Sequence, residues 1–179
     1  MLKSYLQIKF AVVYAIVLVS TVLCTSSCSN ESFDFDNPDI PTYIQQLKSG
    51  KLQAGDVDAA PSFPKFNYND IDELLKYAND FTEIPIFPLS LVTISNDKKI
   101  RLGECVLWTI ESIRIGHPAS IGCKLVYKNA DNYEGIYFLT NDDLDKAVSK
   151  YRQWWDDLRA NPRQIDLVDP LKDSDYMWW

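Results

Sequence analysis

Histidine is almost absent from this chain of 179 residues, and its scarcity argues against two classes of protein. A Ser–His–acid hydrolase would have to use His117, the only histidine, and no nucleophile-elbow motif accompanies it. A structural zinc site needs several clustered His or Cys ligands, whereas Cys105 and Cys123 stand alone. We therefore expect no catalytic residues, no bound metal and no cofactor, and we interpret His117 as a loop residue.

Positive charge is also in short supply. The chain has 18 Lys and Arg residues against 25 Asp and Glu residues, a net charge of −7. An acidic domain repels phosphate backbones, so nucleic acid is not an expected partner. Solenoid repeats and low-complexity tracts are absent too, and the length suits one domain.

Acidic residues are missing from the first 28 positions, whose only charges are Lys3 and Lys9. An uncharged run rich in Val, Ile, Leu and Ala follows at 10–23. As a helix this run would reach about 21 Å, short of the roughly 30 Å hydrocarbon core of a bilayer. A basic start before a short apolar run is typical of a secretory signal peptide, which we assign to residues 1–27.

Small residues precede Cys28, and the segment Thr25-Ser26-Ser27-Cys28 resembles the lipobox of bacterial lipoproteins. That resemblance implies cleavage before Cys28, fatty acyl chains such as palmitate on its sulfur, and attachment to a membrane of the cell envelope. Cleavage would leave 16 basic residues against 25 acidic ones, a net charge of −9. An uncleaved membrane anchor and a plain secreted protein are the alternatives.

The mature chain divides by composition into a polar stretch and one domain. Residues 28–39 carry the acylated cysteine and four scattered acidic side chains, and we interpret them as a tether. We expect residues 40–179 to form a single α+β domain, mostly helical, with a small antiparallel sheet. Apolar periodicity and helix-end signals predict helices at 40–49, 70–79, 98–115 and 141–161, the third of them central. Weaker patterns predict a strand at 91–95 and a hairpin of 124–127 with 133–138.

Cys105 and Cys123 remain for a disulfide once Cys28 is acylated. A bond between them is compatible with an oxidising compartment and would link the central helix to the first strand of the hairpin. Alternatively, Cys105 is a small buried residue on the apolar stripe of its helix. A disulfide requires a short Cα separation, which the sequence does not give, so both interpretations stay open.

Two glutamates flank an aromatic side chain on the central helix. Glu104, Trp108 and Glu111 share the face opposite the main apolar stripe. A carboxylate beside an indole can bind a sugar or act as a general acid, which would suit a glycan hydrolase. Arg101 and Arg114 each lie three residues from a glutamate, however, so we favour structural ion pairs.

The remaining tryptophans fall into two groups. Trp154 and Trp155 lie on the apolar stripe of the last helix and are predicted to be core residues. Trp178 and Trp179 end the chain, where they could stack on a glycan. We favour a tail that folds back and buries them, because burying an indole is worth a few kcal/mol.

Two segments of the sequence look familiar. Residues 101–111 (RLGECVLWTIE) and 151–155 (YRQWW), taken with the lipobox, resemble a family of uncharacterised lipoproteins from Bacteroidetes-type bacteria, a domain of unknown function. The resemblance covers most of the mature chain and implies a location in the cell envelope. It implies no activity, fold or site residue.

These observations favour a non-enzymatic envelope lipoprotein that binds or scaffolds another protein. The membrane is the first expected partner, through lipid on Cys28. The alternatives are a glycan-binding module that uses Trp108, Trp178 or Trp179, and a glycan hydrolase that uses Glu104 or Glu111.

Overall fold

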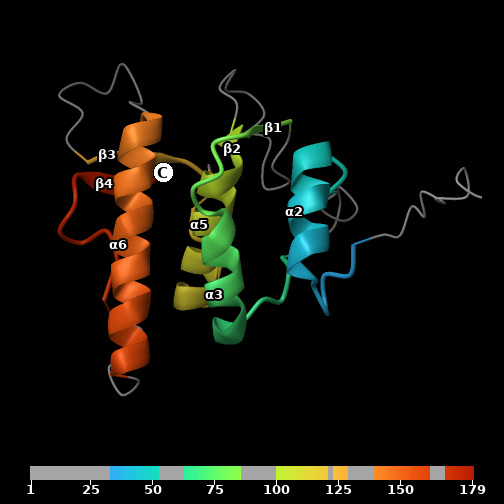
Figure 1. Cartoon of the computed structure of the whole chain (residues 1–179), viewed down its shortest axis with the longest axis horizontal. Helices are drawn as coiled ribbons and strands as arrows, with labels where there is room; N and C mark the ends of the chain where they lie inside the picture. Colours follow the sequence, from blue (N-terminus) through green and yellow to red (C-terminus); the bar gives the residue numbers. More distant parts are fainter. Residues whose placement is uncertain (1–32, 53–62, 86–99, 121–122, 129–138, 162–167) are drawn as a thin grey trace, which may run out of the picture. The chain divides into compact units, whose positions relative to one another are not determined.

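The computed structural model of the chain describes residues 33–52, 63–85, 100–120, 123–128, 139–161 and 168–179. All of them belong to one compact unit, Phe33–Trp179. The unit is an α+β domain, mostly helical, as the sequence predicts (Figure 1). Its elements in chain order are α2 (Ile40–Ser49), η1 (Tyr68–Asp70), α3 (Ile71–Leu74), η2 (Leu75–Tyr77), β1 (Glu83–Ile84), β2 (Ile100–Arg101), α5 (Leu102–Ile115), β3 (Leu125–Tyr127), α6 (Asn141–Ala160) and β4 (Tyr176–Trp178).

Helix α2 has the ends that its local sequence predicts. The side chain of Asp39 accepts a hydrogen bond from the Thr42 N–H at 2.9 Å, and Pro41 lies in the first turn. Gly50 ends the helix with a φ of 66°, a conformation that favours glycine. The helix predicted at 40–49 is therefore confirmed, and it buries one stripe: Ile40, Tyr43, Ile44 and Leu47.

The helix predicted at 70–79 is only partly present, because η1, α3 and η2 follow one another as short turns. Asn67 rather than Asn69 is the cap, and the Asp70 carboxylate accepts a hydrogen bond from the Asn67 N–H at 2.7 Å. The chain then bends so that the Asp80 carbonyl can accept from the Gly103 N–H at 2.8 Å. The predicted buried face is confirmed: Ile71, Leu74, Leu75 and Ala78.

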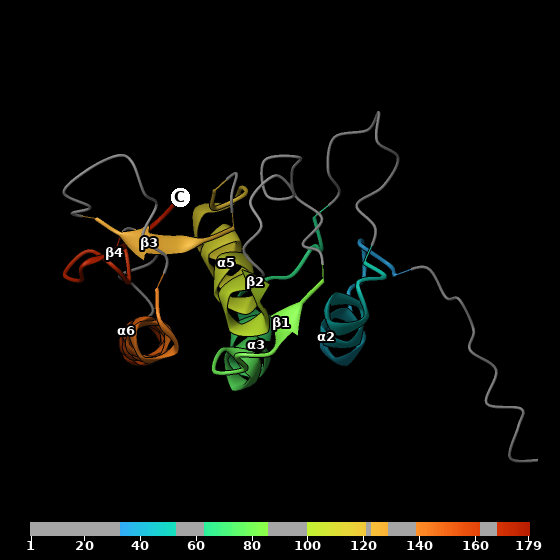
Figure 2. The same cartoon turned by 90° about the horizontal axis from the view of Figure 1, so that it is seen from above.

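Helix α5 is the centre of the core. Ten consecutive residues, 102–111, are buried, and the helix contacts α2, α3, η2 and α6. Figure 2, which looks along the helices, shows α5 between α2 and α6. The helix begins at Leu102 rather than at 98, because Ile100 and Arg101 pair with β1 as a strand. Gly116 ends it with a φ of 74°, as predicted.

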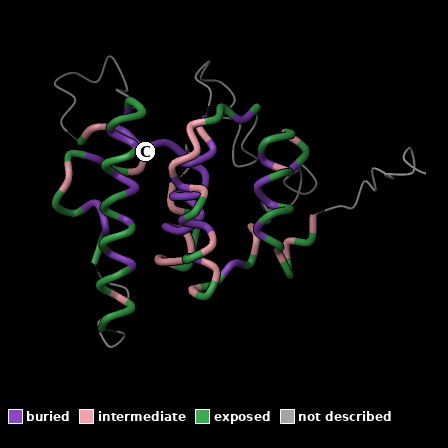
Figure 3. Tube along the Cα trace, in the orientation of Figure 1, coloured by how far each residue is buried: buried purple, intermediate pink, exposed green. Residues whose placement is uncertain are grey.

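Helix α6 confirms the predicted last helix. The Thr140 hydroxyl accepts a hydrogen bond from the Asp143 N–H at 3.2 Å, so Thr140 is the N-cap. Figure 3 shows the buried residues of α6 as an interrupted stripe, with exposed residues between them. Among the described residues, no helix is both long and apolar enough to cross a bilayer.

Strand β3 has a partner that the sequence analysis does not predict. Strand β3 pairs in antiparallel fashion with β4 at the end of the chain, with Leu125 opposite Trp178 and Tyr127 opposite Tyr176. Residues 133–138, the expected partner, and the strand predicted at 91–95 lie outside the described residues. The chain therefore has two small antiparallel sheets, β1–β2 and β3–β4, in its described part.

The packed domain begins before residue 40. Phe33 and Phe35 pack against the core, with their rings 5.0 Å apart at an interplanar angle of 85°. The Phe35 carbonyl also accepts a hydrogen bond from the Lys65 N–H at 2.9 Å. The second half of the expected tether, from Phe33 onward, is thus part of the domain.

A polar cluster around Asp143 joins α6 to the second sheet. The carboxylate accepts hydrogen bonds from Tyr127 on β3 and, at 3.0 Å, from Tyr176 on β4. Thr140 and Lys146 donate to it as well, and these bonds hold the pKa of Asp143 well below its usual range. The hydrogen bond to Asp143 raises the pKa of Tyr127 to about 12, and burial with the same bond raises that of Tyr176 to about 12.

Alkaline pH is expected to weaken the domain through these two tyrosines. In the unfolded chain a tyrosine ionises near pH 10, whereas in the folded domain Tyr127 and Tyr176 keep their protons to about pH 12. Their contribution is complete below pH 10 and is lost as the pH rises to about 12. Urea unfolding at stepped pH should show this fall, and the double variant Tyr127→Phe/Tyr176→Phe should show a shallower one. Parallel curves for the two proteins would refute the assignment.

Replacing Gly103 should destabilise the domain sharply. A Cβ at this position would lie 2.2 Å from the backbone oxygen of Ala78, and backbone cannot move aside as a side chain can. We expect Gly103→Ala to lower the free energy of unfolding by about 3 kcal/mol. The control is Gly116→Ala, where the Cβ meets open space and only the positive φ costs about 1 kcal/mol. Equal losses in thermal or urea unfolding would contradict the steric argument.

Candidate functional site

The carboxylate of Glu104 has a structural role, because its hydrogen bonds are made within the domain. Its carboxylate accepts a hydrogen bond from Nε of Arg101 at 3.0 Å and a longer one from the Leu125 N–H at 3.4 Å. Both partners of the ion pair are largely buried. The side chain thus ties the start of α5 to β3.

The carboxylate of Glu111, toward the other end of α5, also has a structural role. Arg114 donates to both of its oxygens, at 2.9 and 2.5 Å, and the Tyr151 hydroxyl donates to Oε2 at 2.9 Å. The Trp178 indole N–H in turn donates to the Tyr151 hydroxyl at 2.8 Å. Both glutamates therefore have arginine partners, as predicted, and neither is free for the general acid of a hydrolase.

The aromatic candidates do not come together as a platform for sugars. Trp108 is only 2% exposed, and its ring is tilted against Phe63 at 5.6 Å. Trp178 is half-buried, with its N–H directed to Tyr151. Trp179 is also half-buried, and its backbone N–H donates to the Lys124 carbonyl in continuation of the β3–β4 pairing. The tail thus folds back onto the domain.

The two cysteines in the described part of the chain are close neighbours but are not bonded. Cys105 and Cys123 are free and fully buried, with their sulfurs 4.0 Å apart. Burial raises the pKa of both thiols, so neither is poised as a thiolate nucleophile.

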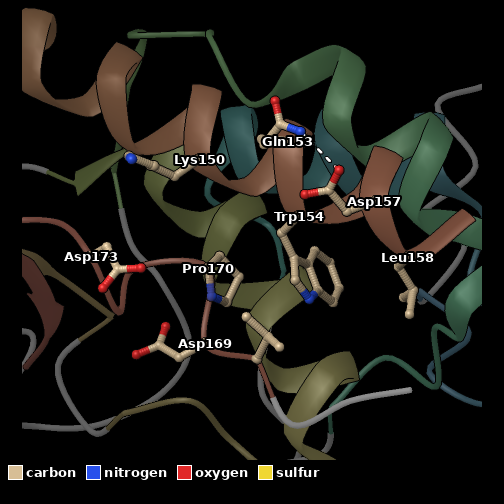
Figure 4. A pocket seen from close by; sticks show the side chains of 9 residues that line it. Lys150, Gln153, Trp154, Asp157, Leu158, Asp169, Pro170 and Asp173 are labelled. Atoms are coloured by element: carbon tan, nitrogen blue, oxygen red, sulfur yellow. Dashed lines mark hydrogen bonds between the residues drawn. The ribbon is translucent and has the colours of Figure 1, made fainter. Parts of the chain in front are cut away.

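A pocket of about 280 Å³ lies where the C-terminal segment crosses α6 (Figure 4). Two stretches of the chain, 150–158 and 168–173, supply its walls. The spacing along α6 follows helical periodicity, which places every contributing side chain on one face. The lining residues are Lys150, Gln153, Trp154, Asp157, Leu158, Val168, Asp169, Pro170 and Asp173.

Trp154 lines this pocket, and the hydrogen bonding of its indole N–H differs from that of three other tryptophans. Trp154 is only 7% exposed, and its ring extends from α6 toward the 168–170 segment (Figure 4). Among the described residues its N–H has no hydrogen-bond acceptor. Three other indoles do have acceptors: Trp108 donates to Ser120 at 3.2 Å, Trp155 to Asp72 at 2.8 Å, and Trp178 to Tyr151 at 2.8 Å.

The Trp154 nitrogen reaches the open space of the pocket. Every fully buried side-chain nitrogen or oxygen in the described part of the chain has a partner, so this unpaired donor is not sealed in the core. A largely buried indole N–H ordinarily finds an acceptor within its own protein. The unpaired donor therefore marks a position where a ligand oxygen can bind.

The charges around the pocket are unequal. Asp157, Asp169 and Asp173 oppose the single ammonium group of Lys150. Asp157 accepts a hydrogen bond from Gln153 at 2.9 Å, and Asp169 accepts one from the Leu171 N–H at 2.8 Å. No cluster able to hold a metal ion occurs among the described residues, so the carboxylates are spread around the pocket.

Sequence patterns place Trp154 in the core, and the structure confirms that it is buried. They do not reveal the pocket, because half of its wall belongs to a tail with no regular periodicity. The scattered acidic residues of that tail were the available signal. Their place in a pocket wall becomes apparent only when the tail is seen packed against α6.

The fold defines a small α+β domain with a ligand-sized hollow beside its last helix and a second pocket, of about 340 Å³, that Trp108 and His117 help to line. The chain belongs to the family described as Domain of unknown function (DUF4943), whose sequence model matches residues 34–179. The predicted resemblance to an uncharacterised family is thereby confirmed. No curated protein and no solved structure matches the chain.

The buried thiols should resist alkylation in the folded protein. Because Cys105 and Cys123 are fully buried and their pKa values are raised, we expect iodoacetamide to label neither of them under native conditions at pH 8. Unfolding in urea without a reductant should make both reactive, as peptide mapping would show. Labelling that appears only after a reductant is added would mean that the two cysteines are joined as a disulfide.

Proposed function

We propose that this protein is a non-enzymatic lipoprotein of the cell envelope, anchored by acyl chains on Cys28, which binds another protein at the Trp154 pocket. One observation carries the binding role: the unpaired indole N–H of Trp154 opens into a pocket at an otherwise buried position. The anchor rests on the leader and on the lipobox-like segment before Cys28.

The pocket suits a protein side chain better than a sugar ring. Trp154 exposes too little of its surface to offer a face for stacking, and Trp178 is held by Tyr151. Val168, which is 58% exposed, adds an apolar rim to the pocket. A rimmed pocket that receives one anchoring side chain is a common centre of a protein interface.

The interface we propose is small. Val168 and Met177, at 58% and 41% exposed, are the only large hydrophobic side chains that stand out on the described surface. A broad apolar face, as in an obligate complex, is therefore missing from this part of the chain. Recognition centred on one pocket is typical of a weaker, reversible contact.

The proposed anchor holds the domain close to the membrane. Phe33 is already packed against the core, so only four residues, or five residue-to-residue steps, separate it from Cys28. Even fully extended, such a segment spans at most about 18 Å. The partner would therefore be a protein at or near the same membrane surface.

Substituting Cys28 tests the anchor. In a bacterial host that acylates lipoproteins, Cys28→Ala should abolish incorporation of labelled palmitate and move the protein out of the membrane fraction. Cys24→Ala is the matched control, since it removes the neighbouring cysteine and should leave both readouts unchanged. Undiminished labelling of Cys28→Ala would refute the anchor.

Site-specific photo-crosslinking tests the binding role. A photoreactive residue at position 153, on the pocket wall, should give one discrete crosslinked protein in the intact envelope. The same residue at position 142, at the other end of α6, should not. Trp154→Phe keeps an aromatic ring but removes the N–H. It should reduce the crosslinked product about fivefold, because the loss of one hydrogen bond weakens binding by about that factor.

Trp155→Phe is the matched control for that experiment. It also removes an indole N–H, but one that bonds to Asp72 rather than facing the pocket. Its crosslinked product should stay at the parental level. If both substitutions reduce the product equally, or if position 153 gives none, the pocket is not the binding site.

A further inference from the structure

We propose that the Trp154 pocket accepts an arginine side chain of the partner protein. This inference rests on the proposed binding role and specifies its chemistry. It starts from the balance of charge: Asp157, Asp169 and Asp173 line the pocket, Lys150 is the only basic residue of the lining, and Arg114 on α5 also interacts with Asp169. An excess of carboxylates around an otherwise apolar hollow favours a cationic occupant.

The pocket wall is made partly of apolar side chains and partly of acidic ones. Trp154, Leu158, Val168 and Pro170 offer apolar surface, while the aspartates supply hydrogen-bond acceptors. A long aliphatic stem with a cationic head matches this combination, because the stem can cover apolar surface while the head meets the carboxylates. Lysine and arginine both have that form.

Arginine fits better than lysine for two reasons. Its planar guanidinium group presents five donors and can bind more than one separated carboxylate at once, whereas an ammonium group acts as a compact point charge. Guanidinium groups also pack favourably against indoles, and the domain already shows such a contact: Arg159 lies 5.9 Å from the ring centre of Trp155 on the same helix.

The unpaired indole N–H completes the recognition. An arginine head has only donors, so it cannot accept a hydrogen bond from Trp154. A backbone carbonyl beside that arginine can accept it. The pocket is therefore matched to an arginine residue within a polypeptide rather than to a free cation.

Substitution of Lys150 and substitution of the aspartates should change arginine binding in opposite directions. No ion pair of Lys150 occurs among the described residues, so at the pocket rim it competes with an incoming cation. Removing its charge should strengthen binding of arginine, whereas removing aspartate charges should weaken it. A purely structural role for these exposed residues would not produce opposite effects.

The experiment uses the mature chain without lipid and the probe N-acetyl-arginine-N-methylamide, titrated while ¹H–¹⁵N spectra are recorded. The neutral isostere N-acetyl-citrulline-N-methylamide serves as the comparison probe. We expect the arginine probe to shift the Trp154 indole signal and to bind at least fivefold more tightly than citrulline. Raising the salt concentration should weaken it, because the contact is partly exposed.

Variants then assign the binding to the pocket charges. Asp169→Asn/Asp173→Asn should weaken binding of the arginine probe about tenfold, and Lys150→Gln should strengthen it about threefold. Asp142→Asn, at the distant end of α6, is the control for net charge and should change it little. All four residues are exposed, so these variants should fold like the parent.

The outcomes separate this inference from the proposed function. Equal binding of arginine and citrulline, weaker binding after Lys150→Gln, or a shift of the Trp154 signal by methyl glucoside alone would each overturn the arginine assignment. If Trp154-dependent crosslinking at position 153 persists in any of these cases, the protein-binding role still stands. Loss of both the probe response and the crosslink overturns the two proposals together.

Discussion

The architecture of this domain depends on neutralising one carboxylate, that of Glu111, inside its core. Helix α5 is buried along ten consecutive residues, so a charge there loses its water and must find partners within the protein. Arg114 supplies the opposite charge from the next turn, and Tyr151 donates a hydrogen bond from α6. Because Tyr151 also accepts a hydrogen bond from Trp178, a single ionised group fixes α5, α6 and β4 relative to one another.

The pocket follows from that constraint. Trp178 holds β4 at Tyr151, and Tyr176 bonds to Asp143 near the start of α6, so the tail is fixed at two points. The chain that leads into β4 must then pass along α6, with Pro170 buried against the domain. Its exposed acidic side chains stand opposite those of the helix. Thus the buried ion pair, which does not line the pocket, is linked through Tyr151 and Trp178 to the tail that supplies part of the pocket wall.

The helices could be predicted from the sequence because their signals are local. Gly50, Gly116 and Thr140 act within one turn of the helix ends they define, and apolar periodicity identified the buried faces. The pairing of β3 with the end of the chain could not be predicted, because it joins residues about fifty positions apart without a turn between them. The pocket was missed for the same reason, since the tail enters it by long-range docking. Helical periodicity also identified Trp154 as buried, but it gives no information on whether an indole N–H has an acceptor.

The negative charge of the domain suits both the proposed anchor and the proposed pocket. A basic domain held within about 18 Å of anionic head groups would be drawn onto them, and a binding surface could be covered. The chain that the proposed cleavage would leave has a net charge of −9, so it would be repelled instead and could keep its pocket turned to the surrounding solution. The repulsion is screened over about 8 Å at physiological ionic strength, which is shorter than the reach of the tether. The same negative charge that would keep the domain off the lipid would attract a basic partner, so one property of the composition suits both the proposed attachment by lipid alone and the proposed recognition of arginine.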